Sequence, residues 1–270
     1  REDNWFLHVH LWDPHTPYRA AEKYGEPFAD ELLPPWLTED IRASHWQQAG
    51  PHSAQECNGF APKPMMLDAF PRQPQQISDM QGVRQMFDGY DTGVLVADEY
   101  FGRLLNDLQE LGVMEDTAIV LSSDHGETLG ELNVYGDHQT ADQITTRVPM
   151  ILKWPGADHL NGRKYEAMHY QIDVSATIVE LLGVRVPKAW DGESFAESLN
   201  DGKDQGRDYL VLSQGAWTCQ RAVRWDDYIL IQTLHDGYHL YDDLMLFDLA
   251  KDPHEIDNLA GQKENIVGLG

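Results

Sequence analysis

Between Ser78 and Gly183 the sequence alternates helix-like and strand-like segments, and this alternation restricts the possible folds more than any other pattern in the chain. Ser78 and Gln81 have the spacing of a capping box, and apolar residues then recur every three or four positions until Gly112. This periodicity predicts a long helix with one buried face. A second helix is expected over residues 172–183, where a glycine again marks the end.

Short apolar runs around these helices predict β-strands. Residues 117–123 ("TAIVLSS") form the kind of short apolar run that is typical of a strand buried in a parallel sheet, and residues 147–155 ("RVPMILKWP") predict another strand. The opening residues 5–12 ("WFLHVHLW") also predict a strand, which runs into a loop at Asp13-Pro14. We therefore expect an α/β fold with a mixed, largely parallel sheet flanked by helices.

The pattern changes beyond about Asp201. Four short strand-like runs follow, separated by turns and without a comparable helix: "DYLVLSQ", "QRAVRW", "DYILIQTL" and "LMLFDL". They predict a small antiparallel sheet. We expect two domains, with residues 1–200 as the α/β core domain and residues 201–270 as a small antiparallel subdomain. Residues 14–74 carry ten of the fourteen prolines and predict a long irregular connection.

Composition excludes several classes of partner. The formal net charge of -25 at pH 7 argues against nucleic acid or an anionic membrane as the main partner. No apolar run approaches the roughly 20 residues that a membrane-spanning helix needs. The two cysteines, Cys57 and Cys219, are too few for a disulfide framework and lack the paired spacing of a zinc site.

Histidine and aspartate residues cluster in three loops at or near the ends of predicted strands. The clusters are Asp124-His125-Gly126, His10 with Asp13 and His15, and Asp137-His138. Because ligands bind at the carboxyl ends of parallel strands, these clusters are expected to share one edge of the sheet. A carboxylate beside an imidazole can hold a divalent cation, and a glycine lets the backbone turn close to it. The alternative for Asp124 and His125 is a turn with an Asx hydrogen bond and a structural histidine.

Four segments, taken in order, resemble the sulfatase family of the alkaline phosphatase superfamily. They are "WDPHTPY", "SSDHGETLGE", "RVPMILKWPG" and "LMLFDLAKDPHEIDNLA". The resemblance covers essentially the whole chain and implies an alkaline-phosphatase-like fold and the metal-dependent hydrolysis of sulfate esters. A phosphodiesterase or phosphonate monoester hydrolase of the same superfamily is an alternative, because such relatives have a histidine at the place that matches His125. A non-catalytic module that binds a sulfated glycan is a third interpretation.

The resemblance implies roles for five residues. Asp124 and His125 match metal ligands, with Ca²⁺ as the expected ion and Mg²⁺ or Mn²⁺ as alternatives. His15 matches the histidine that contacts the sulfate or protonates the leaving group. Many members have a lysine that binds the sulfate at the place where this chain has Asp137 and His138. His138 is the candidate to replace the charge of that lysine, and Asp137 is the alternative residue that contacts the substrate there.

Two elements of the family pattern have no counterpart in the chain. The nucleophile motif Cys/Ser-x-Pro-x-Arg is absent, because Cys57 precedes Asn-Gly-Phe and Cys219 precedes Gln-Arg-Ala. The upstream acidic pair of metal ligands is also absent. The chain therefore resembles the C-terminal part of a sulfatase that is inactive alone, and a missing N-terminal segment of the same protein would carry the formylglycine nucleophile. The expected partner is a small-molecule or glycan sulfate ester.

Overall fold

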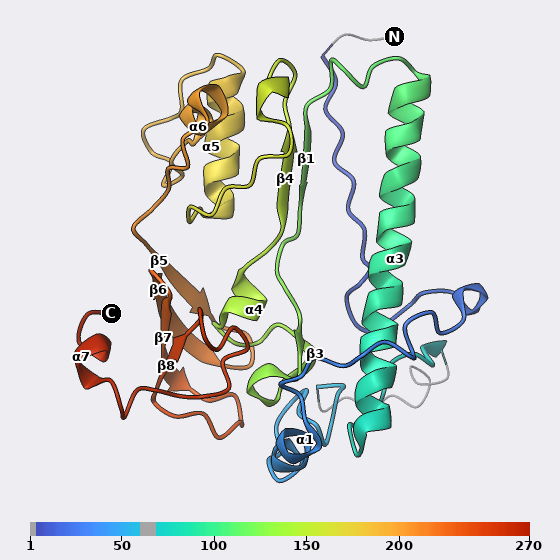
Figure 1. Ribbon diagram of the computed structural model, residues 1–270, viewed down its shortest axis with the longest axis vertical. Coiled ribbons are helices and arrows are strands. Elements are labelled where there is room, and N and C mark those ends of the chain that lie inside the picture. The colour runs from blue at the N-terminus through green and yellow to red at the C-terminus, as the bar shows by residue number, and fades with distance from the viewer. Residues whose placement is uncertain (1–3, 60–68) are drawn as a thin grey trace. The chain divides into compact units, whose positions relative to one another are not determined.

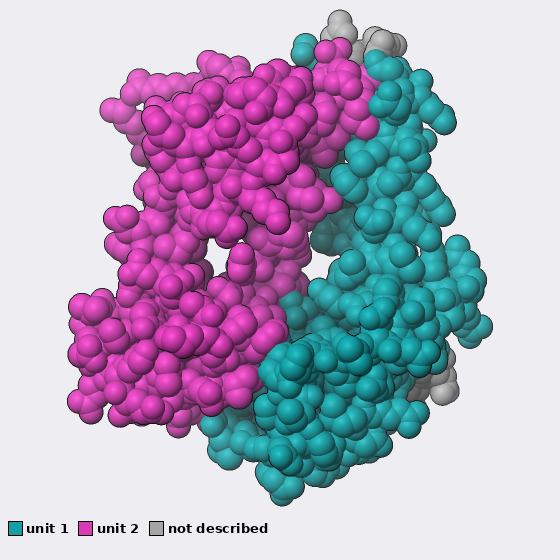
Figure 2. Space-filling model, in the orientation of Figure 1, with its two compact units in different colours: residues 1–112, 127–138, 237–240 teal, residues 113–126, 139–236, 241–270 magenta. Residues whose placement is uncertain are grey.

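The computed structural model describes residues 4–59 and 69–270, and the chain divides into two compact units (Figures 1 and 2). The first unit comprises residues 1–112, 127–138 and 237–240, and the second comprises residues 113–126, 139–236 and 241–270. Within the described ranges, no helix combines the length and the apolar character needed to cross a membrane.

Helix α3 (Met80–Glu110) dominates the first unit and confirms the predicted long helix (Figure 1). Its N-cap is Asp79, whose carboxylate accepts a hydrogen bond from the Gly82 backbone N–H at 2.9 Å. The prediction that Ser78 caps the helix was therefore wrong by one residue, since the aspartate carboxylate already satisfies the first turn. The helix ends as predicted, because Gly112 adopts φ 65° just after its last turn.

Short elements surround α3 in the first unit. They are η1 (Glu22–Tyr24), α1 (Glu39–His45), β2 (Thr128–Leu129), η2 (Glu131–Asn133) and β3 (Tyr135–Asp137). Strands β2 and β3 pair antiparallel, with Thr128 opposite Asp137. The core of this unit joins α3 to the irregular connection and to β3, through Tyr18, Leu37, Ala54, Cys57, Ile77, Val83, Met86 and Tyr135.

The predicted opening strand is not present as a strand. Residues 5–12 carry no strand assignment, and Phe6 is 91% exposed. A strand needs a neighbour for its backbone N–H and C=O groups, and within the described part of the chain no strand pairs with this segment. The aromatic and β-branched composition that favoured a strand therefore lacks the pairing that would complete one.

The second unit contains the strands predicted before and after Asp124. Strands β1 (Ile119–Ser122) and β4 (Met150–Lys153) form a two-stranded sheet, with Ile119 opposite Lys153. This pairing is antiparallel, whereas parallel pairing was expected for residues 117–123. The predicted burial is also incomplete, since Val120 is 38% and Ile151 63% exposed. A short apolar run does not report strand direction, which explains the difference in pairing.

Helices and a four-stranded sheet complete the second unit. The helices are α4 (Gln143–Thr146), η3 (Asp158–Leu160), α5 (Gln171–Leu181), α6 (Ala196–Asp201) and α7 (Glu264–Val267). Helix α5 confirms the second predicted helix, and the Gly183 N–H donates to the Glu180 carbonyl oxygen at 2.8 Å beyond its end.

The four-stranded sheet consists of β5 (Tyr209–Gln214), β6 (Cys219–Trp225), β7 (Tyr228–His235) and β8 (Leu244–Asp248). All neighbours pair antiparallel in chain order, as the sequence predicted. Its centre is apolar, with Ile229, Ile231 and Leu246 fully buried. The domain boundary placed at residue 200 stays a prediction.

A buried ion pair fixes the start of α5 in the second unit. The Asp173 side chain is fully buried and accepts hydrogen bonds from Arg207 Nη2 at 2.7 Å and Nε at 3.0 Å. It also accepts bonds from the backbone N–H groups of Tyr170 and Glu193. Although burial alone would raise the pKa of Asp173, these four bonds together hold it below its usual value.

We expect Asp173→Ala to lower the free energy of unfolding by about 3–5 kcal/mol, because Arg207 would lose its buried partner. Denaturant unfolding of the variant measures this change. The control is Glu193→Gln, since Glu193 contacts the same arginine at 3.1 Å but its side chain is 73% exposed. Its effect should stay within about 1 kcal/mol. Equal effects of the two substitutions would contradict the assignment of Asp173 as the buried anchor.

Candidate active site

The loop that carries His15 packs directly on α3 through two buried glycines. A Cβ atom on Gly89 would lie 2.6 Å from Cδ2 of Tyr18, and one on Gly93 would lie 2.8 Å from Cα of Pro14. Only hydrogen atoms at these two positions allow so close an approach. The Tyr18 ring is 2% exposed and anchors the loop in the core. Residues 14–18 are thus held against a rigid helix, which fixes the backbone of His15.

The β2–β3 hairpin brings a second histidine to this loop. Thr16 Oγ1 donates to the Gly136 carbonyl oxygen at 3.1 Å, joining segments 120 residues apart in the chain. Gly136 adopts φ 74°, and a Cβ there would lie 2.8 Å from Thr16 Cγ2. As a result, the His15 and His138 rings lie edge to face, with their centroids 5.4 Å apart. The structure therefore brings together two of the predicted site residues.

Asp137 lies between two imidazole rings. Its Oδ2 atom is 3.2 Å from Nε2 of His52, and its Oδ1 atom is 3.3 Å from Nδ1 of His138. The His138 backbone N–H also donates to Oδ1 at 2.8 Å. The Asp137 side chain is only 13% exposed, so these contacts are weakly screened by water. Sequence reasoning found Asp137 and His138 but missed His52.

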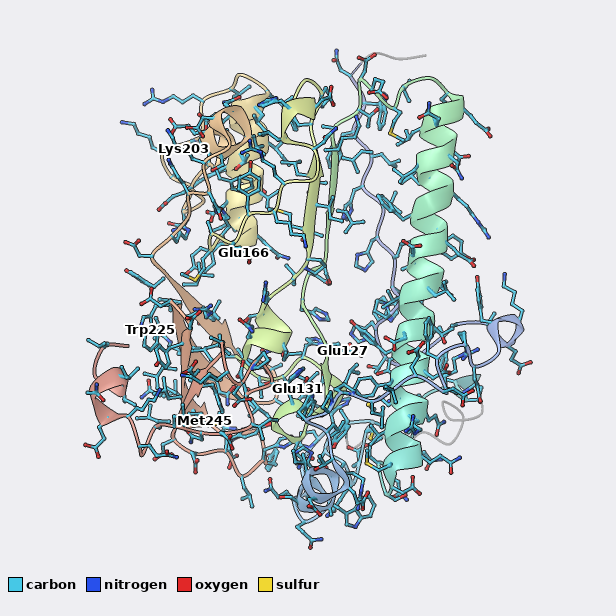
Figure 3. The ribbon with its side chains drawn as sticks, in the orientation of Figure 1. Glu127, Glu131, Glu166, Lys203, Trp225 and Met245 are labelled. Carbon is cyan, nitrogen blue, oxygen red and sulfur yellow. The ribbon has the colours of Figure 1, made fainter. Side chains whose placement is uncertain are left out.

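Glu127 adds a buried acid to the same unit (Figure 3). Burial and the nearby Asp137 carboxylate raise the pKa of Glu127 to about 8, and contacts with Thr16 and Tyr18 offset only part of this rise. Among the residues that the structure describes, Oε1 of Glu127 has no hydrogen-bond partner. The group therefore holds its proton at neutral pH, which reduces its repulsion of Asp137.

The predicted metal ligands Asp124 and His125 lie in the second unit, directly after β1. Asp124 Oδ2 and His125 Nε2 are 3.9 Å apart, and the Asp124 side chain is 68% exposed. The Nδ1–H group of His125 donates to the Gly126 carbonyl oxygen at 2.8 Å, which makes Nε2 the unprotonated nitrogen of the neutral ring. The donor atoms thus fit a divalent cation. Asp124 Oδ1 also accepts from the His125 N–H at 3.2 Å, so a local turn bond is present as well.

Gly126 packs against the backbone of residues 144 and 145, and its suggested role beside a cation stays a prediction. Its N–H donates to the Thr145 carbonyl oxygen at 2.7 Å, and a Cβ at this position would collide with the carbonyl oxygen of Ile144. The backbone after Asp124 and His125 therefore runs against the end of α4. Any larger residue at position 126 would push the two candidate ligands away from this support.

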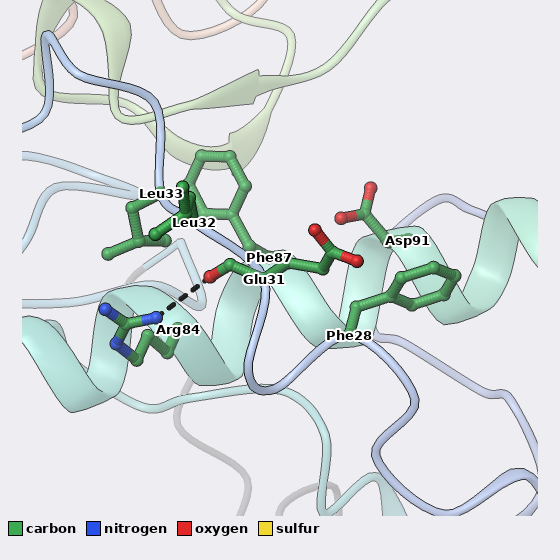
Figure 4. A pocket seen from close by; sticks show the side chains of 7 residues that line it. All are labelled: Phe28, Glu31, Leu32, Leu33, Arg84, Phe87 and Asp91. Atoms are coloured by element: carbon green, nitrogen blue, oxygen red, sulfur yellow. Dashed lines mark hydrogen bonds between the residues drawn. The ribbon is translucent and has the colours of Figure 1, made fainter.

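The pockets of the first unit lie apart from these residues. A small pocket of about 30 Å³ lies between α3 and residues 28–33, where Arg84 donates to the Glu31 carbonyl oxygen at 2.9 Å (Figure 4). A hollow of about 770 Å³ lies nearby and is lined by arginines and acids that include Arg72 and Asp88. Neither is lined by His15, Asp137 or His138. The smaller pocket has room for water only.

Comparison with protein families matches nearly the whole chain. The family model described as sulfatase matches residues 1–184, and the model described as N-sulphoglucosamine sulphohydrolase, C-terminal, matches residues 130–267.

Curated relatives extend these matches. A multifunctional alkaline phosphatase superfamily protein of Trinickia caryophylli is 27% identical over 95% of this chain and 52% of its own length. An ulvan-active sulfatase of Formosa agariphila is 26% identical over 97% of this chain and 51% of its own length. An N-acetylglucosamine-6-O-sulfatase of Bacteroides thetaiotaomicron is 30% identical over 67% of this chain and 33% of its own length. The chain thus spans about half the length, or less, of these relatives.

Solved structures confirm the fold class. A phosphonate monoester hydrolase of Silicibacter pomeroyi superimposes with a TM-score of 0.73 and 23% identity, covering 99% of this chain and 54% of that one. A protein solved with its substrate D-glucosamine-2-N,6-O-disulfate gives a TM-score of 0.67 and 20% identity, covering 95% and 61%. The likeness shows an alkaline-phosphatase-like α/β fold with a C-terminal antiparallel sheet, as predicted.

His45 supports β3 and provides a pH test of the first unit. The Tyr135 hydroxyl group donates to His45 Nδ1 at 2.9 Å, and burial, helped by the charge of Arg42, lowers the pKa of His45 from 6.5 to about 4. Between these values the unfolded chain binds a proton that the folded chain does not. The free energy of unfolding should therefore fall as the pH decreases from 6.5 to 4, by up to about 1.4 kcal/mol per pH unit.

Urea unfolding at a series of pH values, with His45→Gln as the reference, measures this effect. The glutamine can accept the Tyr135 bond but does not titrate. We expect the stability of the natural protein relative to this variant to decline below pH 6.5. Parallel stability curves for the two proteins across this range would show that protonation of His45 does not oppose folding.

Proposed function

Because the chain belongs to the sulfatase family, we propose that the protein hydrolyses sulfate esters, with His15 and His138 at the reacting group. The observation that carries this proposal is the pairing of the two imidazole rings beside Asp137 at the place where family resemblance puts the substrate. The names of the relatives support a small-molecule or glycan sulfate ester as the substrate, since they include an ulvan-active sulfatase and an N-acetylglucosamine-6-O-sulfatase.

We assign His15 the role of general acid. Its Nδ1–H group donates to the Thr16 carbonyl oxygen at 2.6 Å, and on this proposal Nε2 exchanges the proton with the substrate. When the sulfur–oxygen bond to the alcohol breaks, a proton from Nε2 neutralises the departing oxygen, and the imidazole is reprotonated before the next turnover. The contact of residues 14–18 with α3 keeps this ring in place during the reaction.

We assign His138 the binding of the sulfuryl oxygens. A protonated imidazole carries a positive charge and can donate hydrogen bonds to a sulfate, and Asp137 stabilises that charged form from the opposite side. The net charge of -25 does not prevent this binding. Surface charges beyond about 8 Å are largely screened at physiological salt, whereas a unit pair at 4 Å is worth about 4 kcal/mol at an effective dielectric constant of 20.

Asp124 and His125 would hold a divalent cation. When bound, such an ion supplies positive charge that polarises the sulfuryl oxygens and favours the ionised nucleophile. Ca²⁺ is the ion that the family resemblance implies, although imidazole ligands suit Mn²⁺ better than Ca²⁺. The orientation of His125 by the Gly126 carbonyl oxygen is the feature of the chain that supports a metal role.

We propose that the nucleophile, a formylglycine, lies in a part of the protein outside these 270 residues. Neither cysteine of the chain stands in the nucleophile motif. Cys57 is 1% exposed, and burial raises the pKa of its thiol, which makes it a poor nucleophile. The coverage of about half of each relative supports the same conclusion. On this proposal the chain alone does not turn over a substrate.

Replacing Asp124 with Ala in the full-length protein should abolish hydrolysis of an aryl sulfate and leave the fold intact. The loss should exceed the roughly 10- to 100-fold that follows removal of a residue that only orients a metal ligand. Turnover and bound metal, measured by elemental analysis, should fall together. The control is Asp116→Ala, an exposed acid of the same unit. Full turnover and metal content in Asp124→Ala would remove this residue from the site.

Metal removal tests the identity of the ion in the same preparation. A chelator should eliminate turnover, and Ca²⁺, Mg²⁺ and Mn²⁺ are then added back one at a time. Sulfate monoesters, phosphate diesters and phosphonate esters are assayed in parallel. Preference for sulfate supports the proposal, while preference for a phosphorus ester, or binding of a sulfated glycan without turnover, contradicts it.

Replacing His138 with Ala should raise KM or lower kcat for sulfate esters, with a combined loss of about 100-fold in kcat/KM. The physical reason is the loss of the positive charge that faces the sulfuryl oxygens. His159→Ala, at an exposed histidine, serves as the control and should retain the natural kinetics. Unchanged kinetics in His138→Ala would transfer this role to Asp137 or to another residue.

A further inference from the structure

We propose that His52 is a positioning residue that acts through Asp137 to orient the His138 imidazole toward the substrate. This inference rests on the proposed sulfate ester hydrolysis. Its basis is a chain of three side chains, in which each carboxylate oxygen of Asp137 faces one imidazole, at 3.2 Å for His52 and 3.3 Å for His138. The His138 side chain is 30% exposed, against 16% for His52 and 13% for Asp137, so His138 is the ring that a substrate can reach.

The backbone around His52 is held in an uncommon conformation. His52 has φ 58°, which costs free energy for a residue with a Cβ atom and persists only where the surroundings impose it. Its carbonyl oxygen accepts from the Tyr135 N–H at 2.7 Å, two residues before Asp137. On the other side, the Asn133 side chain accepts from the Ala54 N–H at 3.1 Å. These bonds fix His52 relative to the strand that carries Asp137.

A further contact supports the same segment from outside. Nε2–H of His239, which is 1% exposed, donates to the carbonyl oxygen of Pro51 at 2.9 Å. A Cβ atom on Gly50 would lie 2.7 Å from the His239 ring, so the backbone before His52 is pressed against that ring. The position of His52 is therefore determined by residues from three separate parts of the first unit. An exposed loop histidine without a role would not need this support.

The contacts of Asp137 limit the orientation of His138. Nε2 of His52 lies 3.2 Å from Oδ2 of Asp137, within ion-pair distance, and within the described residues the buried Nδ1 of His52 has no hydrogen-bond partner. The His138 backbone N–H donates to Oδ1 at 2.8 Å, which prevents the carboxylate from rotating. His138 presents Nδ1 to this carboxylate at 3.3 Å, so Asp137 faces one edge of the His138 ring.

The arrangement also explains how a histidine can serve where the family pattern has a lysine. A lysine ammonium group is a compact charge with three donors, and it needs little orientation. An imidazole binds through one nitrogen at a time, so its ring plane and proton position must be set by a second group. In this chain Asp137 sets the ring plane and the proton position of His138, and contact with His52 keeps the Asp137 carboxylate in place.

The experiment compares four variants of the full-length protein. His52→Leu removes the donor to Asp137 and should lower kcat about 10- to 100-fold, with KM changed less than about threefold, since loss of orientation slows the chemical step more than binding. His52→Gln keeps a donor and should recover kcat to within about fivefold of the natural value. Asp137→Asn should be at least as slow as His52→Leu. The double variant should be no slower than Asp137→Asn, because the two residues act in one chain.

A spectroscopic readout separates positioning from a general structural effect. Proton–nitrogen correlation spectra of protein labelled with ¹⁵N-histidine report which ring nitrogen of His138 carries the proton. His52→Leu should change the His138 signals, whereas His45→Gln, at another buried histidine of the same unit, should leave both these signals and kcat unchanged. Unfolding curves verify that each variant is folded, and His52→Ala, which also lacks the imidazole, replaces His52→Leu if that variant is not.

The outcomes distinguish this inference from the proposed function. Natural kcat and natural His138 signals in His52→Leu would overturn the inference, and so would additive losses in the double variant or equal losses in His52→Leu and His52→Gln. If the natural protein does not hydrolyse sulfate esters, the proposed function fails. The His138 spectra then decide alone whether His52 positions His138.

Discussion

The close contact between residues 14–18 and α3 is the constraint on which the first unit depends. Gly89 and Gly93 stand in the middle of a 31-residue helix, where each costs about 1 kcal/mol relative to alanine. Their absence of side chains lets Pro14 and Tyr18 lie directly against the helix backbone, and full burial of a large ring returns about 2–3 kcal/mol. The same contact determines where His15 can lie, so stability and site geometry have one origin.

The candidate site is rich in imidazole groups, although the chain as a whole is strongly acidic. The Asp137 carboxylate lies between the rings of His52 and His138, and the His15 ring packs on His138. The neighbouring Glu127 is buried and has a pKa of about 8. A second ionised carboxylate there would oppose an anionic substrate, and burial removes that charge at neutral pH. On the proposed function, the imidazole rings then face the sulfate ester without a second carboxylate charge beside them.

Much of the fold could be predicted from periodicity, and the exceptions have a physical pattern. Both long helices and all four strands of the C-terminal sheet were predicted, since each buries a face with the period of its element. The predictions failed for residues 5–12, which form no strand, and for the direction of the β1–β4 pair. Both features depend on which backbone segment lies alongside. Composition reports burial, whereas pairing is set by tertiary structure.

The candidate site shows the same limit at the level of single residues. His15 and His138 could be proposed from motifs, but His52 stands in a proline-rich connection with no recognisable pattern. Its contribution depends on a left-handed backbone and on bonds to Asn133 and Tyr135, about 80 residues away. One signal was present in the sequence: an aspartate at the family's lysine position leaves a negative charge that needs a cationic or donor partner. That requirement predicts a partner for Asp137, and only the folded chain identifies it as His52.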